Sequence, residues 1–341
     1  MSYKAYFRAY LPRLEALMEQ MIAPRTPAVR MHYEMMAYHL GWRDEHLRPA
    51  RVNAGKRVRP MLCLLACEAV GGNPEDALPA AAGIELLHNF SLIHDDIEDD
   101  SPTRRGRPTV WKLWGVPQAI NVGDGMFSLA HRAFHRLADR HPAERVLAAL
   151  RIFDDVCVAL TEGQHMDMRF EGMLDVTVED YLHMVKGKTA ALISASVALG
   201  ALLGGASPHV QQAYARFGEN LGLAFQVEDD ILGIWGDEAK TGKSTASDIL
   251  TKKKSLPVLY ALNHPEVGNR MRALYAGPPF TDEDVPQVLA LLEEAEAHAY
   301  AQRTAREFHA QALAALDEAG LDSPAHRALR DFANDLLGRE A

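Results

Sequence analysis

The stretch HDDIEDDSPTRRGRPT, from His94 to Thr109, decides how the rest of the chain is organised. The preceding run, AAAGIELLHNFSLI, has apolar residues at helical spacing, and Ser101-Pro102 predicts where that helix stops. We therefore expect an acidic last helical turn followed by a basic loop. The charged residues of the stretch are Asp95, Asp96, Glu98, Asp99 and Asp100, then Arg104, Arg105 and Arg107.

This arrangement repels itself, because a helix C-terminus already carries about half a unit of negative charge. Asp95 and Asp99 are four residues apart, so they project from one helix face. Carboxylates of this kind suit Mg²⁺, which keeps waters and takes further oxygens from substrate phosphates. The arginines nearby would supply forked donors for the same phosphates. The alternative is a solvated acidic helix end, which is the better interpretation of an acidic run that stands alone.

The bulk composition is that of an ordinary globular protein. The chain has 341 residues, of which 48% are hydrophobic and 24% charged, and a net charge of −10. This charge argues against a nucleic-acid partner. Positive charge is concentrated locally in islands that fit a small polyanion better than a polymer: Lys56, Arg57 and Arg59; Arg104, Arg105 and Arg107; Lys240, Lys243 and Lys252 to Lys254.

The remaining global features favour a reduced, cytoplasmic protein. Three cysteines provide neither a disulfide framework nor a zinc site, and Cys63 and Cys67 are expected to be buried. The N-terminus is amphipathic and contains acids, unlike a secretory signal. The longest apolar run, Ala190 to Ala206, is interrupted by serines and glycines and falls short of the ~20 residues that span a bilayer, so no membrane span is expected.

Helical periodicity runs through nearly the whole chain, and strand signals are almost absent. We therefore predict an all-α protein, a single helical domain over residues 1–341, with irregular stretches at 235–255 and 264–280. The predicted helices are Tyr10–Met21, Met61–Val70, Pro79–Asp99, Pro117–Ala138, Ala143–Gly163, Val178–Leu203, Pro208–Ile231, Leu256–Leu262, Thr281–Gly320 and Ala325–Leu337.

Three shorter stretches carry weaker signals. NAGKRVRPM (53–61) is a glycine-led loop that places Lys56 and Arg59 near a helix N-terminus, which favours anions. TEGQHMD (161–167) puts Gln164 and Asp167 on one helix face, where a surface role is the default. KGKTA (186–190) opens an apolar helix with Lys188, which needs an anionic partner there.

The stretch FQVEDDILGIWGDEAKTGKSTASDILTKKKSL, from Phe225 to Leu256, repeats the logic of the first. Glu228, Asp229 and Asp230 are expected to end a helix that Gly233 and Gly236 interrupt. A lysine-bearing loop rich in Gly, Ser and Thr follows. Two acidic helix ends, each followed by its own cationic loop, favour a functional site over solvent-exposed charges that have no role.

These motifs together resemble the trans-polyprenyl diphosphate synthase family, which makes farnesyl, geranylgeranyl and longer diphosphates. The resemblance runs from about Gly55 to Pro257 and includes GKRVRP, HNFSLIHDDIEDD, RRGRPT, GQHMD, GKTA, FQVEDD and the GK…SDILTKKKSLP loop. It implies the isoprenoid-synthase-type helical bundle, a homodimer, and a central cavity with the two aspartate motifs facing each other across its mouth.

The resemblance also implies a role for each matching residue. Three Mg²⁺ are expected, held by Asp95 and Asp99 of the first motif and by Asp229 of the second; Asp96 and Asp230 are counted with the catalytic residues. The allylic diphosphate would contact Arg104, Lys188, Lys243 and Lys253. The pocket for isopentenyl diphosphate would consist of Lys56, Arg59, His88 and Arg105, and the polar groups at the reacting carbons would be Thr189 and Gln226.

One position departs from the family pattern. The second motif usually reads DDxxD, but here its last place is Gly233. The third metal site is therefore expected to be weaker, because it lacks one carboxylate. Glu228 could compensate, although its helical angle is wrong for a simple exchange. We expect activity to survive.

The expected chemistry follows from charge. Mg²⁺ and fixed cations absorb the negative charge on a departing diphosphate, and the double bond of isopentenyl diphosphate attacks the allylic cation. Phe90 and Ser91 precede Asp95 by about one turn, ~6–7 Å deeper, where they would limit chain length. We predict a medium-chain product, geranylgeranyl first and farnesyl second. Phe90 is otherwise a core residue.

Three alternatives remain. A longer-chain polyprenyl diphosphate synthase would share every motif. A terpene cyclase would lack a reason for GKRVRP and for paired Arg104-Arg105, and it would release hydrocarbon without isopentenyl diphosphate. A non-catalytic subunit of a heteromeric prenyltransferase could lose acids freely, and Gly233 is the feature that favours it. Assaying the purified chain alone distinguishes the three.

Overall fold

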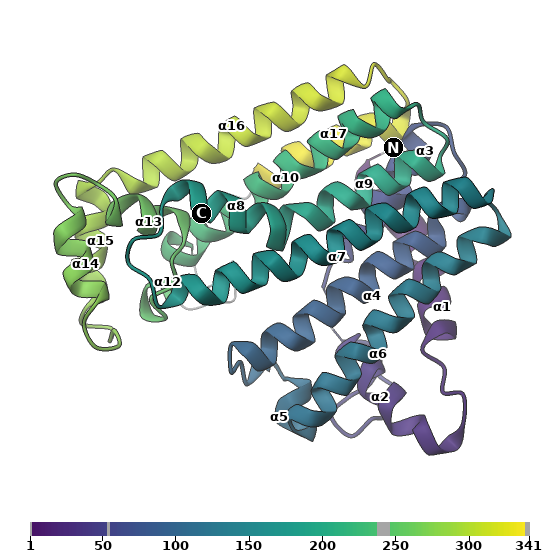
Figure 1. Cartoon of the computed structure of the whole chain (residues 1–341), viewed down its shortest axis with the longest axis horizontal. Helices are drawn as coiled ribbons and strands as arrows, with labels where there is room; N and C mark the ends of the chain where they lie inside the picture. Colours follow the sequence, from purple (N-terminus) through teal and green to yellow (C-terminus); the bar gives the residue numbers. More distant parts are fainter. Residues whose placement is uncertain (1, 53–54, 237–245, 338–341) are drawn as a thin grey trace. The chain divides into compact units, whose positions relative to one another are not determined.

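The structure is a computed structural model that describes residues 2–52, 55–236 and 246–337 (Figure 1). Within these ranges the regular secondary structure is helical, apart from one short hairpin and an isolated bridge between Arg43 and Pro49. This confirms the all-α prediction. Lys240 and Lys243 lie outside the described residues.

The elements follow one another in this order: α1 (Tyr3–Met21), η1 (Pro27–Val29), α2 (Arg30–His39), α3 (Val58–Ala69), α4 (Pro74–Glu98), β1 (Thr103–Arg104), β2 (Arg107–Pro108), α5 (Val110–Trp114), α6 (Val116–His135), η2 (Arg136–Asp139), α7 (Ala143–Glu171), α8 (Val178–Val185), η3 (Lys186–Ala190), α9 (Ala191–Leu203), α10 (Pro208–Trp235), α12 (Ser247–Leu250), α13 (Leu256–Leu262), α14 (Gly268–Tyr275), α15 (Val285–Glu294), α16 (Ala297–Glu318) and α17 (Pro324–Leu337).

Two compact units divide the chain, and each is built from separated segments. The first consists of Met1–Phe153, Ser196–Gln211 and Asp322–Leu329, and the second of Asp154–Ala195, Gln212–Leu321 and Arg330–Ala341. The first acidic motif belongs to the first unit and the second motif to the second. The single domain expected from the sequence stays a prediction.

Helix α4 is the centre of the first unit. Asn73 caps its N-terminus by accepting a hydrogen bond from the Glu75 amide at 3.1 Å, and Pro74 occupies the first turn, so the helix begins before the predicted Pro79. Its small residues allow close packing against α6 and α3, and Figure 1 shows α4 and α6 side by side. At Gly83, for example, a Cβ would lie 2.8 Å from a ring carbon of Phe134.

The second unit has its own apolar core, to which α8, α10, α13, α15 and α16 contribute. Helix α13 is almost entirely buried, and it contacts α8, α14, α15 and α16. Residues such as Val227 and Ile231 of α10 and Leu259 of α13 are within 3% of full burial. This core surrounds the second acidic motif with apolar side chains.

Other predictions of helix boundaries and of irregular segments also need correction. Helix α10 does not end at the acidic motif but continues through Gly233 to Trp235. The helix predicted over 281–320 is broken between α15 and α16, where Glu296 adopts a left-handed φ of 54°. The segment 264–280, expected to be a loop, contains α14.

One stretch, Val178–Leu203, is long and apolar enough to cross a membrane by length and composition, and 67% of its most apolar window is buried inside the protein. This stretch comprises α8, η3 and α9. Burial of this extent is typical of a core helix.

Candidate active site

The first acidic motif lies where the sequence places it, at the C-terminus of α4. Asp95 lies in the last turn and Asp99 is the C-cap, whose amide donates to the Asp95 carbonyl at 2.9 Å. Asp100 follows with a left-handed φ of 48°, and the Ser101 amide returns to the Asp96 carbonyl. This capping keeps Asp95 and Asp99 in helical register on one face.

Asp96 differs from its neighbours because it points into the protein. Its side chain is 2% exposed, and Arg104 Nε donates to Oδ1 at 2.7 Å. Within the described residues the other carboxylate oxygen has no hydrogen-bond partner. Burial raises the Asp96 pKa to about 6, although Arg104 opposes the shift. Asp96 therefore anchors the arginine-bearing segment to the helix end.

That arginine-bearing segment is a hairpin, which the sequence analysis missed. β1 and β2 pair antiparallel, with Arg104 opposite Arg107. The two loop residues, Arg105 and Gly106, have left-handed φ values of 53° and 75°, as a type I′ turn requires. Gly106 was the available signal, but an Arg-Gly turn is a weaker one than Asn-Gly.

Arg107 makes structural contacts within the first unit. It donates to the carbonyls of Tyr38 at 3.1 Å and Arg43 at 2.7 Å, and its guanidinium lies 4.0 Å from the centre of the Tyr38 ring. The Tyr38 hydroxyl in turn donates to the Pro108 carbonyl at 2.7 Å. These contacts hold the second strand of the hairpin against α2.

Arg57 is likewise structural rather than available to substrate. Its buried guanidinium donates to Glu85 at 2.7 Å, to Glu15 at 3.1 Å and to the Leu40 carbonyl at 2.9 Å. Asn89 also donates to Glu85, at 2.8 Å. Two carboxylates and a carbonyl thus neutralise this cation and fix the loop that leads into α3.

Three of the four residues predicted to bind isopentenyl diphosphate, Arg59, His88 and Arg105, come together in the first unit. Arg59 from α3 lies 3.4 Å from the His88 ring nitrogen on α4, measured between Nη1 and Nε2. The Arg105 guanidinium covers Gly55, where a Cβ would lie 2.6 Å from Nη2. Gly55 has a φ of 89°, so a side chain is disfavoured there on both counts. Lys56 follows Gly55 and is exposed.

This cluster of Arg59, His88 and Arg105 combines a neutral histidine with crowded positive charges. Burial and the surrounding arginines lower the His88 pKa well below its usual value, so the ring is neutral at physiological pH. Burial is also the main cause that lowers the pKa of Arg59 and of Arg105; Arg105 adds to the effect on Arg59, and Arg104 adds to the effect on Arg105. Like charges crowded in this way are stabilised by an anion.

A small pocket beside the hairpin adds a residue that the sequence analysis missed. It is lined by Tyr38, His39, Asp96, Arg104, Arg105, Arg107, Pro108, Thr109 and Val110. The buried Nε2 of His39 has no hydrogen-bond partner among the described residues. Burial first, and then the nearby arginines, hold the His39 pKa well below its usual value. Nothing in its sequence context signals this position.

The chain-length candidates lie one turn before the first motif. The Phe90 ring packs 4.7 Å from His94 and 5.0 Å from Phe127 of α6, measured between ring centroids. Ser91 donates to the His88 carbonyl at 2.9 Å. Phe90 is therefore part of an aromatic contact between α4 and α6, and its role in chain length stays a prediction.

In the second unit, Asp230 is the centre of a buried hydrogen-bond network. Its carboxylate accepts from the Tyr181 hydroxyl, from Gln226 at 3.1 Å and from the Leu256 amide at 2.9 Å. Burial raises the Asp230 pKa, while Lys253 and these donors oppose the shift. With its oxygens engaged, Asp230 joins α8, α10 and α13. Asp229, next to it, is partly exposed.

Lys253 lies between two carboxylates of the second unit. Its Nζ is 3.7 Å from Asp230 and 3.6 Å from Asp248. Burial by itself lowers the Lys253 pKa, but these carboxylates outweigh it and the net shift is upward. The lysine is charged and held at the motif, with 44% of its side chain exposed.

Lys188 has the anionic partner that its position demands. It donates to Asp167 of α7, so the expectation that Asp167 is a plain surface acid is wrong. Lys188 lies in η3, a π-helical turn of the kind often found at functional sites. The next residue, Thr189, donates to Gln226 at 3.0 Å, which links this pair to the Asp230 network.

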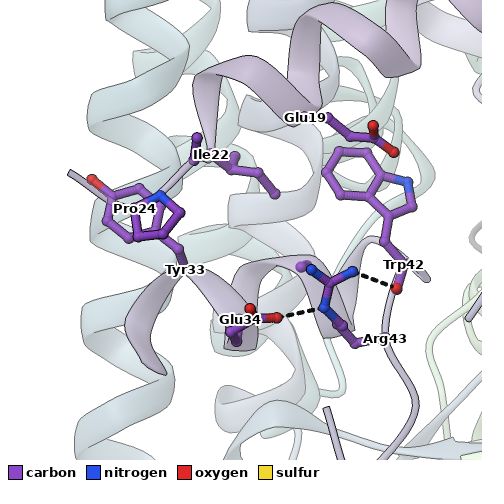
Figure 2. A pocket seen from close by; sticks show the side chains of 9 residues that line it. Glu19, Ile22, Pro24, Tyr33, Glu34, Trp42 and Arg43 are labelled. Carbon is purple, nitrogen blue, oxygen red and sulfur yellow. Dashed lines mark hydrogen bonds and ion pairs between the residues drawn. The ribbon is translucent and has the colours of Figure 1, made fainter. Parts of the chain in front are cut away.

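A pocket of about 290 Å³ elsewhere in the first unit has a different character. Figure 2 shows it between the end of α1 and α2, with Arg43 paired to Glu34 and aromatic Tyr33 and Trp42 on its walls. Glu19, also in its lining, pairs with Arg51. Its charged groups neutralise one another, so it offers a diphosphate no excess positive charge.

Comparison with known proteins decides the family. A sequence model described as polyprenyl synthetase matches residues 44–292. The chain belongs to the polyprenyl synthetase family. It is 39% identical over 344 residues to the (2E,6E)-farnesyl diphosphate synthase of Mycobacterium tuberculosis (strain ATCC 25618 / H37Rv), covering 98% of this chain and 94% of that protein. It is 42% identical over 311 residues to the geranylgeranyl diphosphate synthase of the same strain, covering 88% of each.

A solved polyprenyl synthetase from Streptomyces coelicolor A3(2) matches with a TM-score of 0.90 and 35% identity, covering 98% of this chain and 100% of that one. Polyprenyl synthetases have the all-α isoprenoid-synthase fold, so the fold prediction is confirmed. This polyprenyl synthetase is therefore an enzyme of isoprenoid biosynthesis, a short-chain trans-prenyltransferase.

Members of this family need divalent metal ions. Across the described residues, no three His, Cys, Asp or Glu side chains are grouped so as to hold a metal unaided. Mg²⁺ does not require such a cage, since one or two carboxylates, waters and substrate phosphates complete its octahedron. Asp95 and Asp99, in register at a helix end, offer that donor set, and the residues present fit the ion.

Proposed function

We propose that the protein condenses isopentenyl diphosphate with an allylic diphosphate to form an all-trans medium-chain diphosphate, and that the reaction depends on Mg²⁺. The observation that carries this proposal is the meeting of Arg59, His88 and Arg105 from three separate segments. A second diphosphate needs such a site, because it is bound without its own metal. A terpene cyclase has no use for it.

Asp95 and Asp99 would hold two Mg²⁺, and Asp229 would hold a third. Bound Mg²⁺ supplies positive charge to the diphosphate leaving group. Arg104, Lys188, Lys243 and Lys253 would contact the same diphosphate. Asp96 and Asp230 act through others, since each fixes a cation: Arg104 for Asp96 and Lys253 for Asp230.

The reaction then follows from where charge develops. The allylic C–O bond breaks and its electron pair leaves with the diphosphate, which the fixed cations stabilise. The double bond of isopentenyl diphosphate, positioned by Lys56, Arg59, His88 and Arg105, forms the new C–C bond. A proton is lost to the departing diphosphate. Thr189 and Gln226 would face the reacting carbons, and the apolar helices exclude water from the cation.

We propose geranylgeranyl diphosphate as the product and farnesyl diphosphate as the second candidate. This chain is 42% identical to a geranylgeranyl diphosphate synthase and 39% identical to a farnesyl diphosphate synthase. Phe90, partly exposed and packed against α6, would limit the growing chain. A longer-chain product would require a path past this aromatic contact. We also propose a homodimer and a cytoplasmic location.

The direct test is to incubate the purified chain with labelled isopentenyl diphosphate, Mg²⁺ and each of dimethylallyl, geranyl and farnesyl diphosphate. We expect geranylgeranyl diphosphate as the product when Mg²⁺ is present. We expect no product when EDTA is present. Asp95→Asn should lower turnover by about 10²–10³-fold. The exposed Asp154 provides a matched control, Asp154→Asn, which should retain it.

The other outcomes of this assay identify the alternatives. Hydrocarbon released without isopentenyl diphosphate would identify a cyclase. No turnover by the chain alone, restored only by a second subunit, would identify a component of a heteromeric enzyme.

A further inference from the structure

The structure places a carboxylate where the second motif lacks one. Gly233 occupies the place at which the family pattern has its last aspartate. A Cβ built on Gly233 would overlap the Asp248 side chain, lying 2.5 Å from its Cγ. Glycine within a helix costs about 1 kcal/mol relative to alanine. Here it leaves the space that the Asp248 carboxylate fills.

Helix geometry puts this carboxylate on the correct face of α10. Asp229 and Gly233 are four residues apart, so they lie on one side of the helix about one turn, ~6 Å, apart. A carboxylate above Gly233 therefore shares a face with Asp229. Glu228 does not, because it is five residues from Gly233, about 140° away around the helix. Consistent with this, the charge that acts on Glu228 is Arg306 of α16.

Asp248 is held firmly in this position. Its side chain is 10% exposed, its carboxylate lies 3.6 Å from Lys253 Nζ, and its carbonyl accepts from the Lys253 amide at 2.9 Å. Lys253 also faces Asp230, so one lysine spans both acids. Such a carboxylate needs little reorganisation to act on a ligand at this face.

We propose that Asp248 supplies the carboxylate missing from the second motif and, with Asp229, holds the divalent metal of that motif on the allylic diphosphate. This inference rests on the proposed function. Under this proposal the motif keeps a second carboxylate although position 233 is glycine, and the compensation is assigned to Asp248 instead of Glu228.

The test relocates the carboxylate along this contact. Asp248→Asn keeps the shape and removes the charge. Gly233→Asp restores the family motif but overlaps Asp248. The double variant Gly233→Asp with Asp248→Gly moves the carboxylate from α12 to α10. Asp282→Asn, at an exposed position of the same unit, is the matched control. Thermal unfolding monitored by circular dichroism verifies that each variant folds.

The readout is binding of Mn²⁺ in the presence of inorganic pyrophosphate, counted by electron paramagnetic resonance. We expect Asp248→Asn to weaken the last-bound Mn²⁺ by about 10- to 100-fold. Gly233→Asp should weaken it as well, and the double variant should bind more tightly than Gly233→Asp. Asp282→Asn should match the wild type.

Two results would overturn the inference: wild-type Mn²⁺ binding by Asp248→Asn, or a double variant no better than Gly233→Asp. A folded Glu228→Gln variant that alone loses the ion would return the compensation to Glu228. Failure of the proposed function is distinguishable from these results, because the wild type would then bind no Mn²⁺ with pyrophosphate.

Discussion

His39 lines the pocket beside the hairpin with its Nε2 atom buried, and its surroundings determine how it titrates. Burial is the main cause that lowers its pKa, and the nearby Arg104, Arg105, Arg57 and Arg107 add to the effect. The native protein therefore leaves His39 neutral at a pH where the unfolded chain protonates it. Stability attributable to this group is complete above about pH 6.5 and is lost as the pH falls below that value.

We expect the free energy of unfolding to fall below pH 6.5, with His39 contributing up to about 1.4 kcal/mol per pH unit. His39→Gln removes this contribution, so its urea unfolding curves from pH 7 to pH 5 should show a shallower loss than the wild type. His46→Gln, at an exposed position, should keep the wild-type slope. Equal slopes for all three proteins would contradict the assignment.

Phe90 carries the prediction of chain length. Phe90→Ala removes the ring that contacts Phe127 and opens space one turn before Asp95. We expect a shift toward products longer than geranylgeranyl diphosphate, measured by chromatography of the dephosphorylated alcohols. Phe134→Leu, a buried change between α4 and α6, is the control for general loosening. An unchanged spectrum for Phe90→Ala would place the limit at another residue.

Charged residues of the site could be predicted, but their partners could not. Asp95, Arg59 and Lys188 stand out because acids at a helix end and cations in a glycine-led loop or an apolar helix need ligands. Lys188, however, pairs with Asp167, 21 residues away along the chain, and no local pattern specifies that contact. For the same reason the sequence could not show that Arg107 donates its hydrogen bonds to backbone carbonyls.

At the scale of elements, the close approach of η3 to α7 positions Lys188. A Cβ on Gly163 of α7 would overlap the Lys188 backbone, lying 2.8 Å from its Cα. A Cβ on Gly187 would lie 2.7 Å from the Ala159 carbonyl oxygen. The atoms that an added Cβ would meet at both glycines are backbone atoms, so no flexible side chain could move aside to make room.

We therefore expect Gly163→Ala to lower the free energy of unfolding by about 1–3 kcal/mol, since overpacking exceeds the gain in helix propensity. Turnover should fall as well, because Lys188 is displaced from Asp167. Gly172→Ala is the matched control: no described atom lies within 4 Å of its Cβ position, so stability should be unchanged or slightly higher. Chemical denaturation of both variants measures the difference.

Elements were predictable where the apolar period is strong, and less so where tertiary packing overrides local signals. Helix α10 continues through Gly233, where Ile231 and Ile234 on either side are buried in the core of the second unit and the Asp248 carboxylate fills the space beside the glycine. The hairpin after α4 is stabilised by Tyr38 and Asp96, which lie outside it. Neither contact is visible in the local sequence.

At the scale of the whole molecule, the proposed homodimer is the first claim to test. Apolar side chains are exposed on α6, with Val116 40% and Ile120 41% exposed. We expect sedimentation equilibrium to give about twice the chain mass of 37.7 kDa. Ile120→Lys should shift the protein toward monomer, whereas Leu11→Lys, an equally exposed apolar position on α1, should not. A monomeric wild type would contradict the proposal.

The composition of the whole chain indicated a small polyanionic ligand, because islands of cations in an acidic protein favour one. The prenyltransferase class came from the resemblance of the motifs, and the family match confirms it. The presence of two acidic motifs could also be predicted. Their division between two compact units could not, since the units interleave along the chain and no linker or change of composition marks where one ends.

The central proposal, drawn from the proposed function, is that both acidic motifs serve the diphosphate of one allylic substrate. The most direct measurement is a double-mutant cycle of kcat/KM for isopentenyl diphosphate condensation, with Asp95→Asn, Asp229→Asn and the double variant. Groups that act as one unit give strongly non-additive losses. We predict that each single variant loses about 10²–10³-fold and that the double variant loses little more. Losses that multiply, or an Asp229→Asn variant with wild-type turnover, would contradict the account.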